Sequence, residues 1–116
     1  MVGANFDPSH LFWMGADPLA ATRVLAPAIY HVHAKDTHID SDRLYALGIL
    51  GLGWHTPKLP GLGDVAWGPL FSALYEVGYH GPVCIEVEDR AYEGSLDDRK
   101  RALRQSKRFL EQYVSS

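Results

Sequence analysis

The sequence predicts an α/β fold in which short parallel strands alternate with helices. Three short apolar runs, residues 2–6, 28–34 and 82–87, have the length and composition of buried strands. A segment with helical spacing or helix-capping residues follows each run. Each run also ends at or next to a metal-binding residue type, namely Asp7, His33 and Glu86. Strand–helix repeats of this kind form parallel sheets with right-handed crossovers, so the three strand ends are expected to meet at one edge.

The first helix is expected after a loop that follows Asp7. Asp17 is placed to cap this helix, and Pro18 suits its first position because proline lacks an N–H that would be unpaired there. The apolar stripe of the helix is expected to consist of Leu19, Ala20, Val24 and Leu25.

Two later helices are indicated by apolar spacing and by capping residues. One begins near Pro69 and ends at Gly78. The last begins at Ser95, with Asp98 three residues on as an acidic variant of the capping box. Their buried faces are expected to be Leu70, Phe71, Leu74 and Tyr75 in the first, and Leu96, Leu103, Leu110 and Val114 in the second.

The stretch between the second strand and the second helix, residues 35–67, is rich in glycine and proline. Connections of this length are uncommon in compact domains and are usually functional, so a lid-like role is expected. Residues 43–50 are compatible with either a short helix or a hairpin.

Composition limits the possible partners and the compartment. The 116 residues are 47% hydrophobic and 22% charged, which is typical of one globular domain. The formal net charge of −3 favours neither nucleic acid nor an anionic membrane as a partner. Cys84 is the only cysteine, which excludes an internal disulfide. Because no signal peptide or membrane-spanning stretch is recognisable, the cytoplasm is the expected compartment.

The predicted fold is too small to be a closed barrel. Three parallel strands alone leave strand edges and one sheet face uncovered. A complete (β/α)₈ barrel takes roughly 250 residues, about twice the length of this chain. The sequence therefore predicts a partial (β/α)₈ TIM barrel in a single domain, residues 1–116. We expect it to be completed by self-association as a homo-oligomer, or by association with a missing half-barrel.

Four motifs carry a resemblance to a known family. They are NFDPSH at residues 5–10, HVHAKD at 31–36, PGLGDVAW at 60–67 and GYHGPVCIEVED at 78–89. In this order and spacing they resemble the C-terminal part of the sugar phosphate isomerase/epimerase family. This family belongs to the xylose isomerase-like TIM barrel superfamily, together with inosose dehydratases, ketose 3-epimerases and endonuclease IV. The resemblance implies that the chain holds the last three βα units of the barrel.

The resemblance also implies a divalent metal ion, Mn²⁺, Zn²⁺ or Mg²⁺. In the family the metal is held by a glutamate, an aspartate, a histidine and a second glutamate from four successive strands. Asp7, His33 and Glu86 match the last three positions, and the first glutamate would precede Met1. The implied reaction is isomerisation or epimerisation of a small sugar or sugar phosphate, by proton transfer through a metal-stabilised enediolate, with Glu86 as a catalytic carboxylate.

Three further residues are expected to bind substrate. His10 lies three residues after Asp7, so one turn of helix would bring the two together. Lys35 continues the strand alternation of His33 and would reach a substrate oxygen. Arg43 is a candidate by resemblance, because the family often has an arginine after the histidine strand.

Other polar residues have mainly structural interpretations. Asp7 itself also suits a turn cap, His31 suits the barrel core, and Asp36 is either solvated or orients Lys35 or His33. Glu88 and Asp89 are expected at the rim or paired with Arg90. Asp64 is expected to cap the following helix, Trp67 to pack in the core, and His38, His55 and His80 to be exposed to solvent.

Two other classes of function fit the same motifs. The chain is compatible with a non-catalytic half-barrel that dimerises around an incomplete metal site. It is also compatible with a metal-dependent lyase similar to inosose dehydratase, or with a hydrolase similar to AP endonucleases. The acidic net charge disfavours the last, because a DNA-facing surface needs basic residues.

Overall fold

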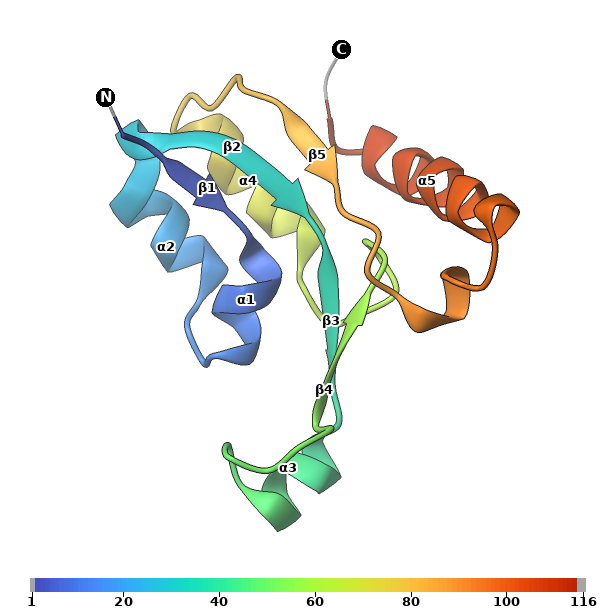
Figure 1. Cartoon of the computed structure of the whole chain (residues 1–116). Coiled ribbons are helices and arrows are strands. Elements are labelled where there is room, and N and C mark those ends of the chain that lie inside the picture. The colour runs from blue at the N-terminus through green and yellow to red at the C-terminus, as the bar shows by residue number, and fades with distance from the viewer. Residues whose placement is uncertain (1, 115–116) are drawn as a thin grey trace.

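The computed structural model describes residues 2–114 and shows the predicted alternation of strands and helices (Figure 1). In chain order the elements are β1 (Ala4–Phe6), α1 (Pro8–Trp13), α2 (Pro18–Leu25), the 3₁₀ turn η1 (Ala26–Ala28), β2 (Ile29–Ala34), β3 (Asp36–Ile39), α3 (Ser41–Leu47), β4 (His55–Lys58), α4 (Trp67–Glu76), β5 (Val83–Ile85), the 3₁₀ turn η2 (Arg90–Tyr92) and α5 (Leu96–Glu111). Among these residues no helix is both long enough and apolar enough to cross a bilayer.

A three-stranded parallel sheet positions the rest of the fold. Its strand order is β1-β2-β5, and Asn5 pairs with His31 while His33 pairs with Cys84. Helices α2 and α4 lie on one side of this sheet, and α5 lies beside β5 (Figure 1). The parallel α/β architecture predicted from the sequence is therefore confirmed.

Side chains of β2 alternate between two different environments. Val32 and Ala34 are fully buried and pack in the core with residues of α4 such as Leu70 and Leu74. His31 and His33 point to the opposite face and are only partly buried. That face carries polar side chains, with Asn5 and Cys84 exposed to solvent. The sheet face that was expected to be uncovered is therefore open, and it is polar.

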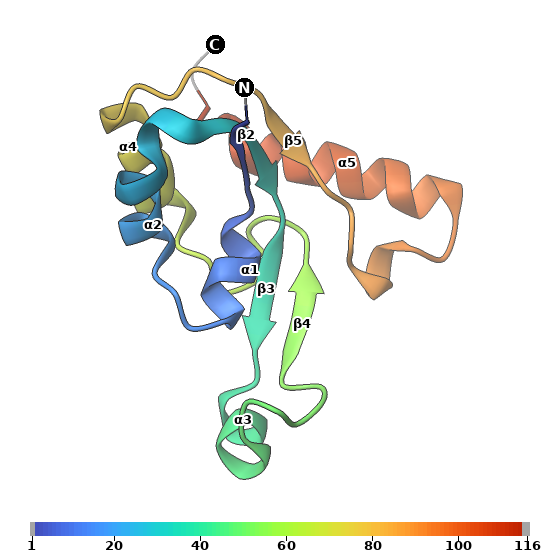
Figure 2. The same ribbon diagram turned by 60° about the vertical axis from the view of Figure 1, so that its left-hand side comes forward.

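Residues 36–58 form a projecting arm rather than an irregular loop. Strand β3 runs on from β2 and pairs with β4 in antiparallel fashion, and α3 lies between them at the tip (Figures 1 and 2). Asp40 caps α3 by accepting a hydrogen bond from the Arg43 amide at 3.0 Å. The stretch that suited either a helix or a hairpin thus contains a helix inside a hairpin.

The buried carboxylate of Asp36 ties the base of this arm to the body. Its Oδ1 accepts hydrogen bonds from the amides of Thr37 and Val65, at 2.8 and 3.0 Å. Its Oδ2 accepts from the Gly61 amide at 2.9 Å and from the Trp67 indole at 2.7 Å. Asp36 therefore holds residues 61–67 against β3, and the expectation that it orients Lys35 or His33 was wrong.

The segment of residues 61–67 also differs from the sequence prediction in the role of Asp64. Asp64 accepts a hydrogen bond from the Ile39 amide at 2.7 Å, whereas the first residue before α4, Ala66, makes no side-chain cap. Asp64 is therefore not the helix cap. A Cβ on Gly63 would lie 2.4 Å from the Thr37 carbonyl oxygen, so the chain needs glycine where it passes this close to β3.

Helices α1 and α2 differ from expectation at particular residues. A six-residue helix, α1, replaces the expected loop after Asp7, because Asp7 and Pro8 together supply an N-cap and a first-turn proline. In α2 the predicted cap at Asp17 is confirmed, but Ala20 is exposed and Val24 is 80% exposed. The buried side of α2 instead presents Thr22, with Ala21 and Leu25 partly buried against the core.

The buried face of α5 differs from the face that its leucines predicted. Ser95 caps α5 as predicted, accepting a hydrogen bond from the Asp98 amide at 3.1 Å. Leu110 is buried, but Leu96, Leu103 and Val114 are exposed. The buried stripe runs through Ala102, Ser106 and Leu110, because Phe109 and Tyr113 pack against the core and rotate the helix away from Leu103.

Replacing Asp36 by asparagine is expected to lower the free energy of unfolding by about 2–4 kcal/mol. Each carboxylate oxygen accepts two N–H donors, so the NH₂ group of asparagine would face two of these donors in either orientation of the amide. Urea denaturation followed by tryptophan fluorescence measures this change. The matched control is Asp42→Asn in the exposed first turn of α3, for which a loss below about 1 kcal/mol is expected. Equal effects of the two changes would contradict the role given to Asp36.

Candidate metal and substrate site

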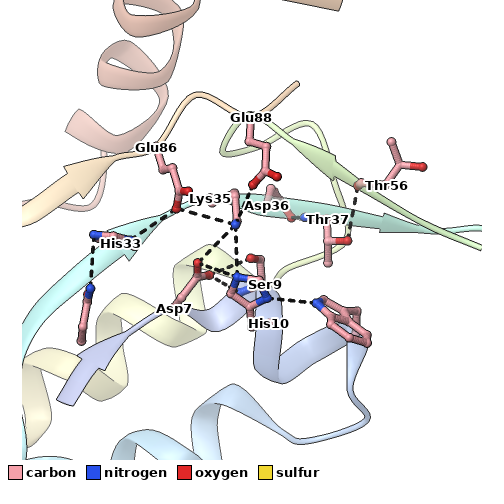
Figure 3. Close-up of polar contacts among 12 residues, drawn as sticks. Asp7, Ser9, His10, His33, Lys35, Asp36, Thr37, Thr56, Glu86 and Glu88 are labelled. Carbon is pink, nitrogen blue, oxygen red and sulfur yellow. Dashed lines mark hydrogen bonds and ion pairs between the residues drawn. The ribbon is translucent and has the colours of Figure 1, made fainter. Parts of the chain in front are cut away.

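The three strand ends bring Asp7, His33 and Glu86 together (Figure 3). One ligand atom from each lies within 4.8 Å of the other two, and all three residues are partly buried. The Nδ1 atom of His33 is 3.3 Å from Glu86 Oε2, and its Nε2 atom is 3.4 Å from the Asn5 amide nitrogen. The cluster follows from the parallel sheet, since equivalent ends of β1, β2 and β5 lie side by side.

Asp7 uses its two carboxylate oxygens for different tasks. Oδ1 caps α1 by accepting hydrogen bonds from the Ser9 amide at 2.9 Å and from the Ser9 hydroxyl at 2.6 Å. Oδ2 lies 3.6 Å from both His10 Nε2 and Lys35 Nζ. Asp7 is thus a helix cap and a member of the cluster at once, and the cap holds Oδ2 in its orientation.

Lys35 is the cation at the centre of this group of carboxylates. Its side chain is only 6% exposed, and Nζ lies 2.8 Å from Glu88 Oε2 and 3.6 Å from oxygens of Asp7 and Glu86. Burial lowers the pKa of the Lys35 ammonium, but the hydrogen bond to Glu88 and the three nearby negative charges outweigh burial and raise the pKa above its usual value. Lys35 therefore stays positively charged at neutral pH.

His10 is held on both sides of its ring. The Trp13 indole N–H donates a hydrogen bond to His10 Nδ1 at 3.1 Å, so neutral His10 carries its proton on Nε2. That nitrogen lies 3.2 Å from Lys35 Nζ, and Asp7 Oδ2 lies 3.6 Å from both nitrogens, so the two donors share this carboxylate oxygen. The Trp13 ring also stacks on the His55 ring, with centroids 4.3 Å apart. His55 is partly buried, so the expectation that it is exposed to solvent was wrong.

A cavity of about 140 Å³ lies beside the cluster. It is bounded by α1, the end of β2, the base of the arm and Glu88, and its lining residues are Ser9, His10, Trp13, Lys35, Asp36, Thr37, His55, Pro57 and Glu88. The cavity presents hydrogen-bond donors from His10 and Lys35 next to an aromatic wall. Such a lining suits a small polar molecule that carries oxygen atoms.

The structure does not gather every predicted site residue. Arg43 lies on α3 in the arm, where its Nε donates a hydrogen bond to the Leu52 carbonyl at 3.0 Å, away from the cluster. Asp89 is buried and accepts hydrogen bonds from the Leu59 and Ala91 amides, so its expected pairing with Arg90 was wrong. Glu88, expected at the rim, joins the cluster through Lys35.

Three residues that contribute to the site were not singled out from the sequence. Asn5 has the same strand phase as Asp7, which places its amide near His33. Ser9 is at the helix position that a capping aspartate bonds. Trp13 is three residues after His10, on the same face of α1. Asn5 was detectable from strand alternation, and Ser9 and Trp13 from helical spacing once α1 was recognised as a helix.

The donor set fits a divalent cation. Two carboxylates and one imidazole are ligands that Mn²⁺ and Zn²⁺ accept, and carboxylate oxygens also suit Mg²⁺. The Ser9 hydrogen bonds to Asp7 orient the ligand as outer partners do in metal sites. The geometry of these three residues is therefore compatible with a single ion.

The parallel strands, crossover helices and strand-end cluster define a segment of a (β/α)₈ barrel enzyme fold. Residues 1–113 match the family described as xylose isomerase-like TIM barrel. The chain belongs to this family, which includes sugar epimerases and inosose dehydratases. The family that the four motifs indicated is thereby confirmed.

Individual relatives agree with this assignment. YfiH of Bacillus subtilis (strain 168), described as uncharacterized, is 40% identical over 99 residues, which cover 77% of this chain and 32% of the relative. The inosose dehydratase of Clostridium tetani is 34% identical over 89 residues, which cover 72% and 29%. A solved xylose isomerase domain protein from Alicyclobacillus acidocaldarius is 28% identical with a TM-score of 0.65, covering 97% of this chain and 37% of that one. The chain thus spans about a third of the length of these relatives.

Replacing Trp13 by phenylalanine is expected to raise the fraction of His10 that carries its proton on Nδ1, because the indole donor to that nitrogen is removed. The imidazole ¹⁵N chemical shifts of His10, measured at a pH where the ring is neutral, report this fraction. The control is Trp54→Phe, whose indole donates to the Ile49 carbonyl and not to His10. A His10 spectrum that is the same in all three proteins would contradict the hydrogen bond.

Proposed function

We propose that this site belongs to a divalent-metal-dependent isomerase or epimerase that acts on a small sugar or sugar phosphate. The observation that supports the proposal is the convergence of Asp7, His33 and Glu86 at one edge of the parallel sheet. Membership of the xylose isomerase-like family adds support. The chain spans about a third of the length of these relatives, so the activity of the whole protein is part of this proposal.

In this proposal Asp7, His33 and Glu86 hold the metal ion. When bound, the ion supplies Lewis-acid stabilisation of negative charge on the substrate oxygens. Lys35 and His10 bind the substrate by donating hydrogen bonds from Nζ and Nε2 to an oxygen in the adjacent cavity. The wall formed by Trp13 and His55 excludes water from one side of that cavity.

Glu86 is proposed to move the proton next to the substrate carbonyl. Its side chain is 40% exposed, so one oxygen is accessible from the open face of the sheet. Its Oε2 lies 3.6 Å from Lys35 Nζ, which places a positive charge beside the proposed base. Glu88 is bound more closely to Lys35, at 2.8 Å, and is proposed to orient that ammonium group.

A dehydratase is the second candidate, because the relatives 32–34% identical to this chain include inosose dehydratases. Both reactions begin with removal of a proton next to a carbonyl, and they differ in the following step. An epimerase or isomerase returns the proton, whereas a dehydratase expels a hydroxyl group as water. The same residues are therefore proposed for the first step of either reaction.

His33→Ala and Glu86→Gln are each expected to weaken Mn²⁺ binding at least tenfold, because each removes one of three ligands. Isothermal titration calorimetry measures the affinity, and far-UV circular dichroism checks that the fold is retained. The controls are His80→Ala and Glu76→Gln, which change exposed residues outside the cluster. Affinities of the ligand variants equal to those of the controls would reject the proposed ligands.

The reaction is tested in D₂O with Mn²⁺-loaded protein and a panel of ketoses, ketose phosphates and inososes. NMR is expected to show deuterium entering the carbon next to the carbonyl, at least a hundredfold more slowly with Glu86→Gln. A rearranged or inverted sugar indicates the isomerase or epimerase, and a dehydrated ketone indicates the dehydratase. Exchange that is independent of metal and of Glu86 would contradict both candidates.

A further inference from the structure

The tip of the arm exposes a concentrated set of large apolar side chains. Three of them are more than four-fifths exposed, and the set is Tyr45 (94%), Leu47 (52%), Ile49 (65%), Leu50 (94%) and Leu52 (83%). Residues 44–54 contain no Asp, Glu, Lys, Arg or His, so this stretch of the tip is uncharged. The charged residues of α3, Asp42 and Arg43, precede it in the first turn of the helix. Contiguous apolar surface of this kind marks an interaction site on a folded protein.

The tip is ordered by its own hydrogen bonds. Arg43 Nε donates to the Leu52 carbonyl at 3.0 Å, and the Trp54 indole donates to the Ile49 carbonyl at 3.1 Å. The Asp40 cap and the β3–β4 ladder hold the two ends of the segment. The apolar side chains therefore belong to a preformed surface, which reduces the entropy lost when that surface binds a partner.

An apolar groove of about 390 Å³ lies beside the tip of the same arm. It runs between the end of α1 and the arm, and its lining residues are Phe12, Trp13, Met14, Gly15, Ile39, Leu44, Ile49 and Trp54. The five exposed apolar side chains of the tip form a ridge beside this groove, and Ile49 belongs to both. Neither the ridge nor the groove lining contains a charged residue. In an interface with twofold symmetry the same surface is used by both copies, so a ridge and a groove on one surface allow each copy to receive the other.

The position of the arm separates this surface from the edges of the sheet. Both views show the arm extending from the carboxyl end of β2, away from the sheet and its covering helices (Figures 1 and 2). Further strands of a barrel would pair at the free edges of β1 and β5. The arm therefore lies apart from the edges at which such strands would pair.

We propose that the arm is the dimer interface between two copies of this chain, with the tip of each arm seated in the groove of the other. The five exposed side chains and the lining of the groove together supply apolar surface for an interface in which each partner buries roughly 800 Å². An uncharged surface has no reason to select a charged partner, whereas an identical copy matches it in both shape and polarity. This inference does not depend on the proposed reaction.

The dimer would also contact the wall of the candidate site. Trp13 lines the groove on one side and donates its indole hydrogen bond to His10 on the other. The partner's tip would therefore cover the outer side of the aromatic wall and shield it from water. The self-association predicted from the sequence would then occur through the arm and not through the strand edges.

Sedimentation velocity of the purified chain tests the proposal. Concentrations from about 1 to about 100 µM cover the dissociation constants expected for a dimer with an interface of this size. The wild-type chain is expected to have the mass of two copies at the upper concentrations. Leu50→Glu/Leu52→Glu is expected to raise the dimer dissociation constant at least a hundredfold. Both side chains are more than 80% exposed, so these changes leave the fold intact, which circular dichroism verifies.

The matched control is Val24→Glu/Leu103→Glu, which changes exposed apolar residues of α2 and α5 outside the arm. This variant is expected to dimerise like the wild type. A wild-type chain that stays monomeric at 100 µM would overturn the proposal and would mean that another molecule covers the tip. A dimer that survives the arm changes, or that only the control changes disrupt, would overturn it as well.

Discussion

Parallel pairing of β1, β2 and β5 is the constraint on which the arrangement depends. The pairs Asn5–His31 and His33–Cys84 align the three strands so that their carboxyl ends lie at one edge. Alternation along each strand then turns every second side chain to the open face, which is how one aspartate, one histidine and one glutamate meet. The helices contribute indirectly, because they bury the other face of β2 and leave the open face to polar side chains.

Two adjacent residues between β2 and the arm have different roles, one in the candidate site and one in the fold. Lys35 and Asp36 are adjacent, yet Lys35 faces the carboxylates of the cluster while Asp36 is fully buried among four N–H donors. Opposite charges next to each other in the sequence suggest a pair, but strand geometry sends neighbouring side chains to opposite sides. The arm is therefore anchored by Asp36, independently of the candidate metal site.

The sequence predicted the strands, the caps at Asp17 and Ser95 and the convergence of Asp7, His33 and Glu86, because these follow from local periodicity and capping chemistry. It did not predict which face of α5 is buried, since the leucines and the aromatic residues of that helix indicate different faces and only tertiary packing decides between them. The arm and the hydrogen bonds of Asp36 were equally inaccessible, because the β3–β4 pairs join residues 16 to 22 positions apart and Asp36 bonds to residues about thirty positions away.

The charge of the cluster gives an independent reason to expect a divalent ion. Three carboxylates, those of Asp7, Glu86 and Glu88, surround the ammonium of Lys35, so the formal charges of these four groups sum to −2. Glu86 and Glu88 are 40% and 49% exposed, so water screens part of this charge, whereas Asp7 is 12% exposed and less screened. One divalent cation would neutralise the remainder.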